Sequence, residues 1–214
     1  YKYSNNFISF IKKSPIDTTI LKIKLQEYYK NHYEHIDIHK INIEPRSYIT
    51  SLPNEFTVDI KSKNYLKKDG ILSIKTRDQK RIFFNYKIKA HVNIYLSRKK
   101  IKKKEELSVI NSMKKSIILD NFKAKPIQDI KNSSLEAKHH ISKDKILTIR
   151  DVQALSLVRK GSSVNINFFR DNINISFTAE ALDDGKLGQI IRVQKTNGKK
   201  LKVKVTGKNK AEII

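Results

Sequence analysis

The 214-residue chain contains no cysteine and no tryptophan, only six glycines and four prolines, and no long apolar run. The lack of cysteine excludes disulfides, thiolate metal sites and cysteine nucleophiles. Since a membrane-spanning helix needs roughly 20 apolar residues, no segment is expected to span a membrane. A chain of this length can still bury a real core, either in one large domain or in two to three small ones.

Positive charge is what the chain has in excess, with 45 Lys and Arg against 21 Asp and Glu and a net charge of +24. Such an excess favours nucleic acid, an anionic surface or an acidic protein as a partner. Lys, Ile and Asn are all abundant, however, as AT-rich codons would produce, so we interpret much of the charge as compositional drift. No nucleic-acid partner is expected, because the lysine run 99–104 lacks the interleaved aromatic side chains that stack on bases.

Residues 1–89 are predicted to form a small N-terminal α/β domain. The break at Ser14-Pro15 precedes Asp17, a predicted N-cap for a helix over about 17–31. From Ile36 onward the apolar residues alternate with polar ones, which predicts strands, and a slip after Ile38 suggests a bulge. Asp69-Gly70 is expected to mark a turn between strands. The predicted apolar stripe of the helix comprises Ile20, Leu21, Leu25, Tyr28 and Tyr29.

A single long strand is predicted where apolar residues alternate from Ile82 to Leu96. A strand of this length is expected to be shared between two domains, so we place the boundary after Lys89. Residues 90–214 are then the second domain, in which Asn197-Gly198 marks a hairpin and residues 126–134 suggest a short helix. The predicted fold class is mainly β (α+β).

Two segments forty residues apart share one plan, a strand followed by Ile, five residues and Leu. Ile101 and Leu107 define the first, and Ile141 and Leu147 the second. We expect the two units to pair by pseudo-twofold symmetry into a compact β-clip. The plan resembles the SAF domain, whose motif has a glycine in each turn. Here Lys104 and Asp144 stand at the glycine positions; Asp tolerates a left-handed turn, whereas Lys needs a compensating geometry.

The C-terminal third has a more specific pattern. Residues 157–166 resemble the pattern Leu-Val-x-x-Gly-x-x-Val-x-Ile. Residues 179–194 are similar to Gly-Glu-Ala-Leu-Glu-Asp-Gly-x-x-Gly-x-x-Ile-Arg-Val-x-Asn, the signature of flagellar basal-body P-ring formation proteins. The resemblance extends from Val92 to Ile213 and implies a C-terminal SAF-like β-clip with β-hairpins. The Cys pair and Trp that relatives often have before this region are missing here.

The resemblance implies a periplasmic, non-enzymatic chaperone that binds P-ring subunits and assists their assembly. The start at Tyr1 rather than Met is what a mature exported chain or a trimmed chain would show, and we interpret it as a mature chain whose signal peptide has been removed. Partner capture is expected at exposed strand edges of the clip, or by a hinge in the long strand that opens a groove between the domains. The signature residues are expected to shape turns rather than to bind a ligand: Gly161, Asp183, Asp184, Gly185, Gly188 and Arg192.

Two other functions stay open: a carbohydrate- or cell-wall-binding SAF module that holds anionic glycans, and a pilus-assembly protein with a SAF domain. An enzyme is the least expected class. The acidic cluster of Glu180, Asp183 and Asp184 has no Ser–His or Cys–His pair, phosphate-binding loop or HExxH motif beside it. We therefore predict no catalytic residue and no cofactor.

Three histidines are the remaining candidates for a metal site. His32, His35 and His39 lie at spacings of three and four, which share a face only on a continuous helix. The β pattern that begins at Ile36 breaks such a helix, and no carboxylate set completes the site. The adjacent His139 and His140 would point to opposite faces of a strand. No metal site is predicted.

Overall fold

The computed structural model describes residues 13–131, 134–170 and 173–213, which form two compact units. The first unit contains the described residues up to Tyr95 together with Lys114–Gln128; the second contains Leu96–Met113 and the described residues from Asp129 onward. This division differs from the predicted boundary after Lys89, because the chain enters the second unit, returns to the first, and leaves it again. The architecture is mainly β, as predicted.

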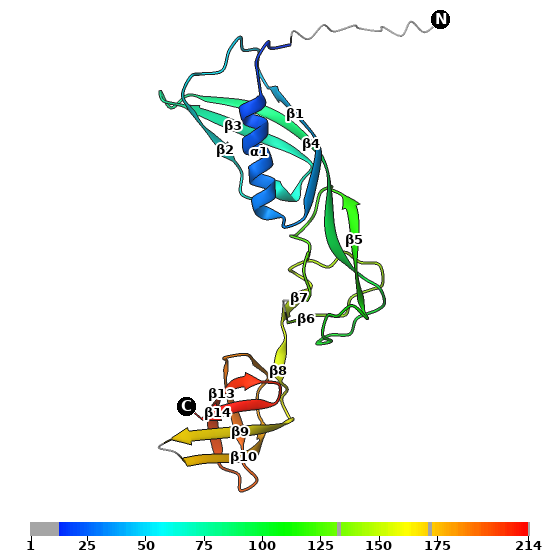
Figure 1. Cartoon of the computed structure of the whole chain (residues 1–214), viewed down its shortest axis with the longest axis vertical. Helices are drawn as coiled ribbons and strands as arrows, with labels where there is room; N and C mark the ends of the chain where they lie inside the picture. Colours follow the sequence, from blue (N-terminus) through cyan, green and yellow to red (C-terminus); the bar gives the residue numbers. More distant parts are fainter. Residues whose placement is uncertain (1–12, 132–133, 171–172, 214) are drawn as a thin grey trace, which may run out of the picture. The chain divides into compact units, whose positions relative to one another are not determined.

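The first unit contains a β-sheet and the helix α1. Its strands follow the order β1-β4-β3-β2, and β5 also pairs with β4. Helix α1 lies across one face of this sheet (Figure 1). The bounds are α1 Thr19–His32, β1 Ile36–Pro45, β2 Phe56–Ile60, the 3-10 turn η1 Asn64–Leu66, β3 Asp69–Thr76, β4 Arg81–Ser97 and β5 Ser112–Ile118.

Helix α1 buries a narrower stripe than the sequence predicts. Leu21, Leu25 and Tyr29 are fully buried, whereas Ile20 is 55% exposed. The assignment of Ile20 to the stripe is wrong, since successive helical residues are rotated by about 100° and Ile20 falls beside that stripe. The N-cap is Thr18 rather than Asp17. The Asp17 carboxylate nevertheless accepts hydrogen bonds from the Thr19 N–H (2.9 Å) and hydroxyl (2.6 Å).

The long strand β4 pairs with β1 on one side and β3 on the other. Its alternate residues from Phe84 to Val92 are buried, as their period of two predicts. Pairing with β1 shifts between Ile38 and Lys40, which confirms the predicted bulge. Asp69 and Gly70, expected to mark a turn, instead begin β3.

The second unit begins with the two related segments. Ile101 and Ile141 form a bridge in which each N–H donates to the other's carbonyl at 2.9 Å, as a pseudo-twofold axis requires. The short strands β6 (Leu135–Ala137) and β7 (Val152–Ala154) pair beside it. The predicted helix over 126–134 is wrong: none of its described residues is helical, and several are buried among neighbouring segments.

A closed barrel completes the second unit, with strands in the order β10-β12-β13-β14-β9. Closure comes from a parallel pair in which Ala211 of β14 lies opposite Ile166 of β9. Outside the barrel sheet, β8 (Ser156–Val158) pairs with β11 (Gly185–Lys186). The barrel strands are β9 Ser163–Arg170, β10 Ile173–Ala181, β12 Ile190–Gln194, β13 Lys200–Gly207 and β14 Lys210–Ile213.

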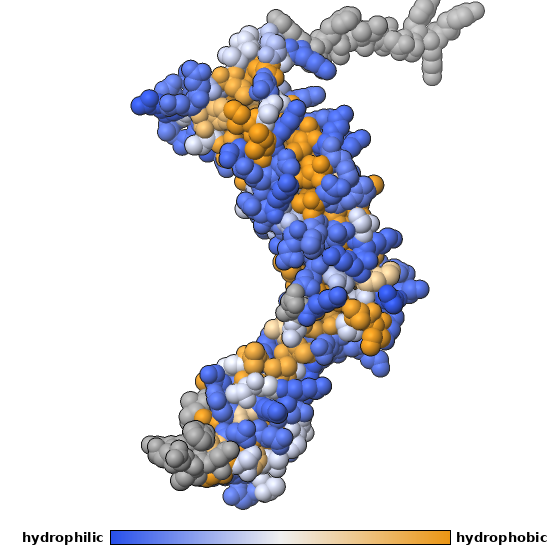
Figure 2. Space-filling model, in the orientation of Figure 1, coloured by the Kyte–Doolittle hydropathy of each residue, from blue (hydrophilic) through white to orange (hydrophobic). Residues whose placement is uncertain are grey.

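Small aliphatic side chains fill the barrel. The hairpin of β12 and β13 confirms the Asn197-Gly198 signal, with Gly198 at a φ of +83°. On the face shown in Figure 2, hydrophilic residues predominate. No helix among the described residues is long and apolar enough to cross a membrane. The buried core of the barrel comprises Val158, Val164, Ile166, Ala179, Ala181, Ile191, Val193, Val203, Val205 and Ala211.

Candidate functional site

The two tight turns of the clip keep a left-handed backbone although neither has a glycine. Lys104 has a φ of +65° and Asp144 a φ of +60°. The Lys104 N–H donates to the Ala137 carbonyl (2.7 Å), and the Asp144 N–H donates to the Ser97 carbonyl (2.8 Å). The four residues are related by the forty-residue repeat, so the same crossed hydrogen bonds hold both turns. Left-handed Lys costs about 1 kcal/mol, which these bonds offset.

A second pair of turns follows, each closed by one side-chain oxygen. The Asn111 Oδ1 atom accepts a hydrogen bond from the Ser108 N–H (2.9 Å). The Asp151 Oδ2 atom accepts the equivalent bond from the Thr148 N–H (3.0 Å), and another from its hydroxyl (2.6 Å). Such turns leave backbone donors free, and the acidic or amide side chain satisfies them.

Asp151 is almost fully buried and forms an ion pair with Lys145. Its Oδ1 atom lies 2.6 Å from Lys145 Nζ and 3.1 Å from His139 Nε2. Burial by itself raises the pKa of the Asp151 carboxyl, but the hydrogen bonds from Lys145 and Thr148 outweigh it and hold the pKa below its usual value. The second half of the clip therefore closes around a buried carboxylate.

Glu136 joins the clip to the barrel. Its side chain is fully buried and accepts hydrogen bonds from the Gln153 amide (2.7 Å) and from the N–H and hydroxyl of Ser156 (both 3.2 Å). Arg159 Nη2 donates to Glu136 Oε2 and to the Lys104 carbonyl (2.9 Å). Burial raises the pKa of Glu136, yet the hydrogen bonds from Gln153, Arg159 and Ser156 prevail and the pKa lies below its usual value.

Two signature aspartates attach the 183–184 loop to its surroundings. Asp184 forms an ion pair with Lys104 Nζ and accepts a hydrogen bond from the Lys160 N–H (2.9 Å). Asp183 receives a two-pronged interaction from Arg192, with Nε at 2.9 Å and Nη2 at 2.8 Å. These hydrogen bonds lower the pKa of the exposed Asp183 carboxyl to about 2.

The three signature glycines have two different physical requirements. Gly161 and Gly188 have φ values of +81° and +74°, which a side chain rarely adopts. Gly185 lies in β11, and a Cβ there would sit 2.7 Å from Val205 Cγ2 and 2.9 Å from Ile191 Cγ2. Its missing side chain therefore permits close packing against the barrel core.

Comparison with known proteins shows the family to which this chain belongs. Residues 92–213, more than half of the chain, match the family described as the chaperone for flagella basal body P-ring formation. The chain belongs to this family. The matched stretch spans both halves of the clip and the whole barrel, including all six signature residues.

The fold is also that of solved structures from this family. The chain is similar to Salmonella FlgA in its open form, with a TM-score of 0.68, 14% identity and 92% coverage of each chain. It is also similar to the flagellar protein FlgA of Thermotoga maritima, with a TM-score of 0.53, 16% identity, and coverage of 92% of this chain and 72% of that one. No curated protein sequence matches the chain.

Within the P-ring chaperone family region, sequence reasoning missed the junction of Glu136 with Arg159. One signal was available, since Glu136 is the only charged residue in the short strand β6. Arg159 stands at an unspecified position of the Leu-Val-x-x-Gly pattern and gave no signal by itself. Both become visible only when the fold brings residues 136, 153 and 159 together.

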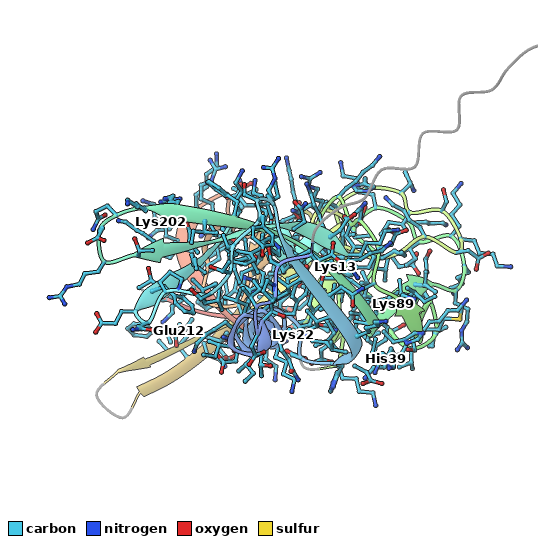
Figure 3. All side chains as sticks on the ribbon, turned by 90° about the horizontal axis from the view of Figure 1, so that it is seen from above. Lys13, Lys22, His39, Lys89, Lys202 and Glu212 are labelled. Atoms are coloured by element: carbon cyan, nitrogen blue, oxygen red, sulfur yellow. The ribbon has the colours of Figure 1, made fainter. Side chains whose placement is uncertain are left out.

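The histidines are scattered among separate contacts. His32 Nδ1 lies 2.8 Å from the Tyr28 carbonyl oxygen, and the His32 ring stacks on Tyr65. His39, in the β1 bulge, has its Nε2 atom 2.6 Å from Nδ1 of His91. Figure 3 labels His39 beside Lys89 of the neighbouring strand. Among residues 13–131, 134–170 and 173–213, no group of three or more His, Cys, Asp or Glu residues is placed to hold a metal.

Proposed function

We propose that this chain is a periplasmic chaperone that binds P-ring subunits and assists their assembly, without catalysing a reaction. The family match over residues 92–213 is the observation that supports this function. The matched family is described as a chaperone for P-ring formation, and the region of this chain that matches it contains the clip and the barrel. No reaction is required for the task, because reversible capture of an aggregation-prone subunit surface is a binding event.

Strand addition has a limited set of places in this fold. The barrel is closed, so its strands offer no free edge to a partner. In the described sheet of the first unit, β1 is paired only with β4 and β2 only with β3, which leaves one edge of each strand open. We therefore extend the β-augmentation hypothesis from the strand edges of the clip to β1 and β2. The hinge in β4 stays a prediction.

Co-purification tests the proposed function. A tagged form of the full chain, expressed in its own host, is expected to retain the P-ring subunit from a periplasmic extract. A secreted protein of similar net charge with the same tag is the control, because a net charge of +24 will retain some acidic proteins without specificity. Failure to retain the subunit, with circular dichroism showing an intact β fold, contradicts the proposal.

A further inference from the structure

Positive charge is distributed unevenly around the barrel. Residues 190–210, from β12 to the start of β14, contain eight Lys and Arg residues and no Asp or Glu. Residues 163–181, which contain β9 and β10, have no Lys and one Arg, Arg170. Apart from Ile175, the described exposed positions of these strands are polar or acidic: Ser163, Asn165, Asn167, Ser176, Thr178 and Glu180.

Lys200, Lys202 and Lys204 form a row along β13. Codon bias and protection of a free sheet edge are two ordinary explanations of such a row, and neither accounts for this one. AT-rich codons specify Asn as well as Lys, so drift alone would not place Lys on one side of a barrel and Asn on the other. Lysines also protect free sheet edges from unwanted pairing. In this barrel β13 lies between β12 and β14, so it has no free edge to protect.

The lysines of β13 form the centre of one outward surface. Lys200, Lys202 and Lys204 are exposed, and they alternate with Leu201, Val203 and Val205, which face the core. Arg192 of β12 lies directly opposite Lys202. We call the five exposed cations the cationic face: Arg192, Lys200, Lys202, Lys204 and Lys210 (Figure 3 labels Lys202).

Only part of this charge is neutralised within the chain. Asp183 forms an ion pair with Arg192, and Glu212 Oε1 lies 3.6 Å from Lys204 Nζ. Among the described residues, Lys200, Lys202 and Lys210 have no acidic group within ion-pair distance. Like charges on neighbouring positions of a sheet repel each other, so the free barrel is less stable for having them. An anionic ligand would relieve this repulsion.

The spacing of the row indicates the shape of that ligand. Alternate residues of a strand are about 6.6–6.8 Å apart, so three lysines span about 13 Å. An extended peptide with a carboxylate at every second residue repeats at the same distance. Lys presents a flexible point charge, which suits carboxylates that are not held in a fixed bidentate geometry.

We propose that the cationic face docks an extended acidic segment of the P-ring subunit. This inference rests on the proposed function for the identity of the partner, and on the barrel itself for the surface and its chemistry. A protein segment is favoured over nucleic acid because residues 190–210, which carry the face, contain no aromatic side chain for base stacking. In the complex, the carboxylates of the acidic segment contact the lysines of the cationic face. The opposite charges also increase the rate at which the two proteins associate.

A binding experiment with charge-removing variants tests the cationic face. The full chain and the triple variant Lys200→Gln, Lys202→Gln, Lys204→Gln are immobilised, and the purified P-ring subunit is the analyte. The matched control is Lys99→Gln, Lys100→Gln, Lys103→Gln, which removes the same charge from exposed positions of the clip. Since each exposed charge pair contributes little and the variant loses three of them, the barrel variant is expected to bind about tenfold more weakly. The clip variant should stay within about twofold of the unmodified chain.

Salt gives a second readout of the same contact. Raising it from about 0.05 M to about 0.5 M should weaken binding of the unmodified chain much more than that of the barrel variant. Equal losses in the two triple variants would show that net charge alone matters, and would overturn the inference. Unchanged affinity of a folded barrel variant would overturn it as well.

A peptide arm separates the face from the identity of the partner. A ten-residue peptide of alternating Glu and Thr is titrated into the 15N-labelled full chain, against a peptide of equal composition with its Glu residues in one block. The alternating peptide should bind more tightly and shift the amides of residues 192–210. Shifts elsewhere, or tighter binding of an anionic polysaccharide to the same face, contradict the acidic-segment docking. Binding of the peptide without any binding of the P-ring subunit supports the face and overturns the proposed partner.

Discussion

The two halves of the clip have the same backbone and different chemistry. Residues 96–112 and 136–152 make matching bridges, in which Leu96 opposite Ile146 corresponds to Glu136 opposite Glu106. The first half has an apolar residue where the second has a buried carboxylate. The turn closed by the Asn111 amide in the first half is closed by the Asp151 carboxylate in the second.

Comparing the two halves shows which features of the turns both halves share and which position can vary. The clip needs a left-handed residue in one turn and a side-chain oxygen in the next, and both halves supply these. It tolerates either a neutral or a charged group at the same place, provided that a charged group has partners. The second half accordingly surrounds its carboxylates with Lys145, Arg159 and hydrogen-bond donors.

Removing Glu136 should have the largest effect on stability. Glu136→Ala leaves the Arg159 guanidinium beside the barrel without its carboxylate. Breaking a buried ion pair costs about 3–5 kcal/mol, and we expect about 3 because Arg159 is one-third exposed. Urea unfolding, followed through the amide NMR signals of the second unit, measures the change, because that unit contains no tyrosine or tryptophan to serve as a fluorescent probe. Glu212→Ala, which removes an exposed carboxylate from the barrel, is the control and should cost less than about 0.5 kcal/mol.

Truncating the two turn residues tests the asymmetry directly. Asp151→Ala removes the acceptor of Thr148 and leaves Lys145 unpaired, so a cost of about 2–3 kcal/mol is expected. Asn111→Ala removes the neutral counterpart and should cost about 1–2 kcal/mol. The same unfolding assay compares them. Equal costs would mean that the charge of Asp151 adds nothing to the turn.

Acid should loosen the second half of the clip, which has two buried carboxylates, more than the first half, where the Asn111 amide donates to Glu105 at 3.0 Å and the pKa of Glu105 is also lowered. The pKa values of Asp151 and Glu136 are lowered in the folded chain, so their contribution is fully present above about pH 4.5. It is lost as the pH falls through the lowered values. The melting temperature should therefore be steady from about pH 7 to pH 5 and fall below about pH 4. Asp151→Asn should narrow the stability gap to the unmodified chain as the pH falls; a constant gap would contradict this.

Restoring glycine in the left-handed turns should give the smallest effect. Asp144→Gly relieves the backbone cost at φ +60° and is expected to stabilise the chain by about 0.5 kcal/mol. Lys104→Gly relieves a similar cost but removes the ion pair with Asp184, so the net change should be near zero. Adding Asp184→Asn to each variant completes the cycle. Coupling of residue 144, rather than 104, to Asp184 would refute this account.

Much of the fold was predictable because its signals are local. The alternation along β4 and the slip after Ile38 depend only on which face of a strand each residue occupies, and the structure confirms both. The start of α1 was misplaced by two residues, since Asp17 bonds to Thr19 without being the N-cap. The turn assigned to Asp69-Gly70 failed because pairing with β4 draws both residues into β3.

The contacts of the candidate site were not predictable from one sequence. Lys104 and Asp184 are eighty residues apart, and Glu136 meets Arg159 only after both clip and barrel have formed. The lysine row of β13 was visible in the sequence as a half-exposed strand. Its meaning changed once barrel closure showed that β13 is not an edge and that β9 and β10 lack such a row.

The parallel pairing of β14 with β9 has a consequence for the order in which the molecule matures. A hairpin such as β9–β10 can form as soon as its own residues are available, but the barrel seam joins residue 211 to residue 166. Until β14 emerges from a ribosome or an export channel, the barrel is an open sheet with two unpaired edges. During that interval this chaperone would itself have the kind of exposed strand edges that require protection in a newly exported protein.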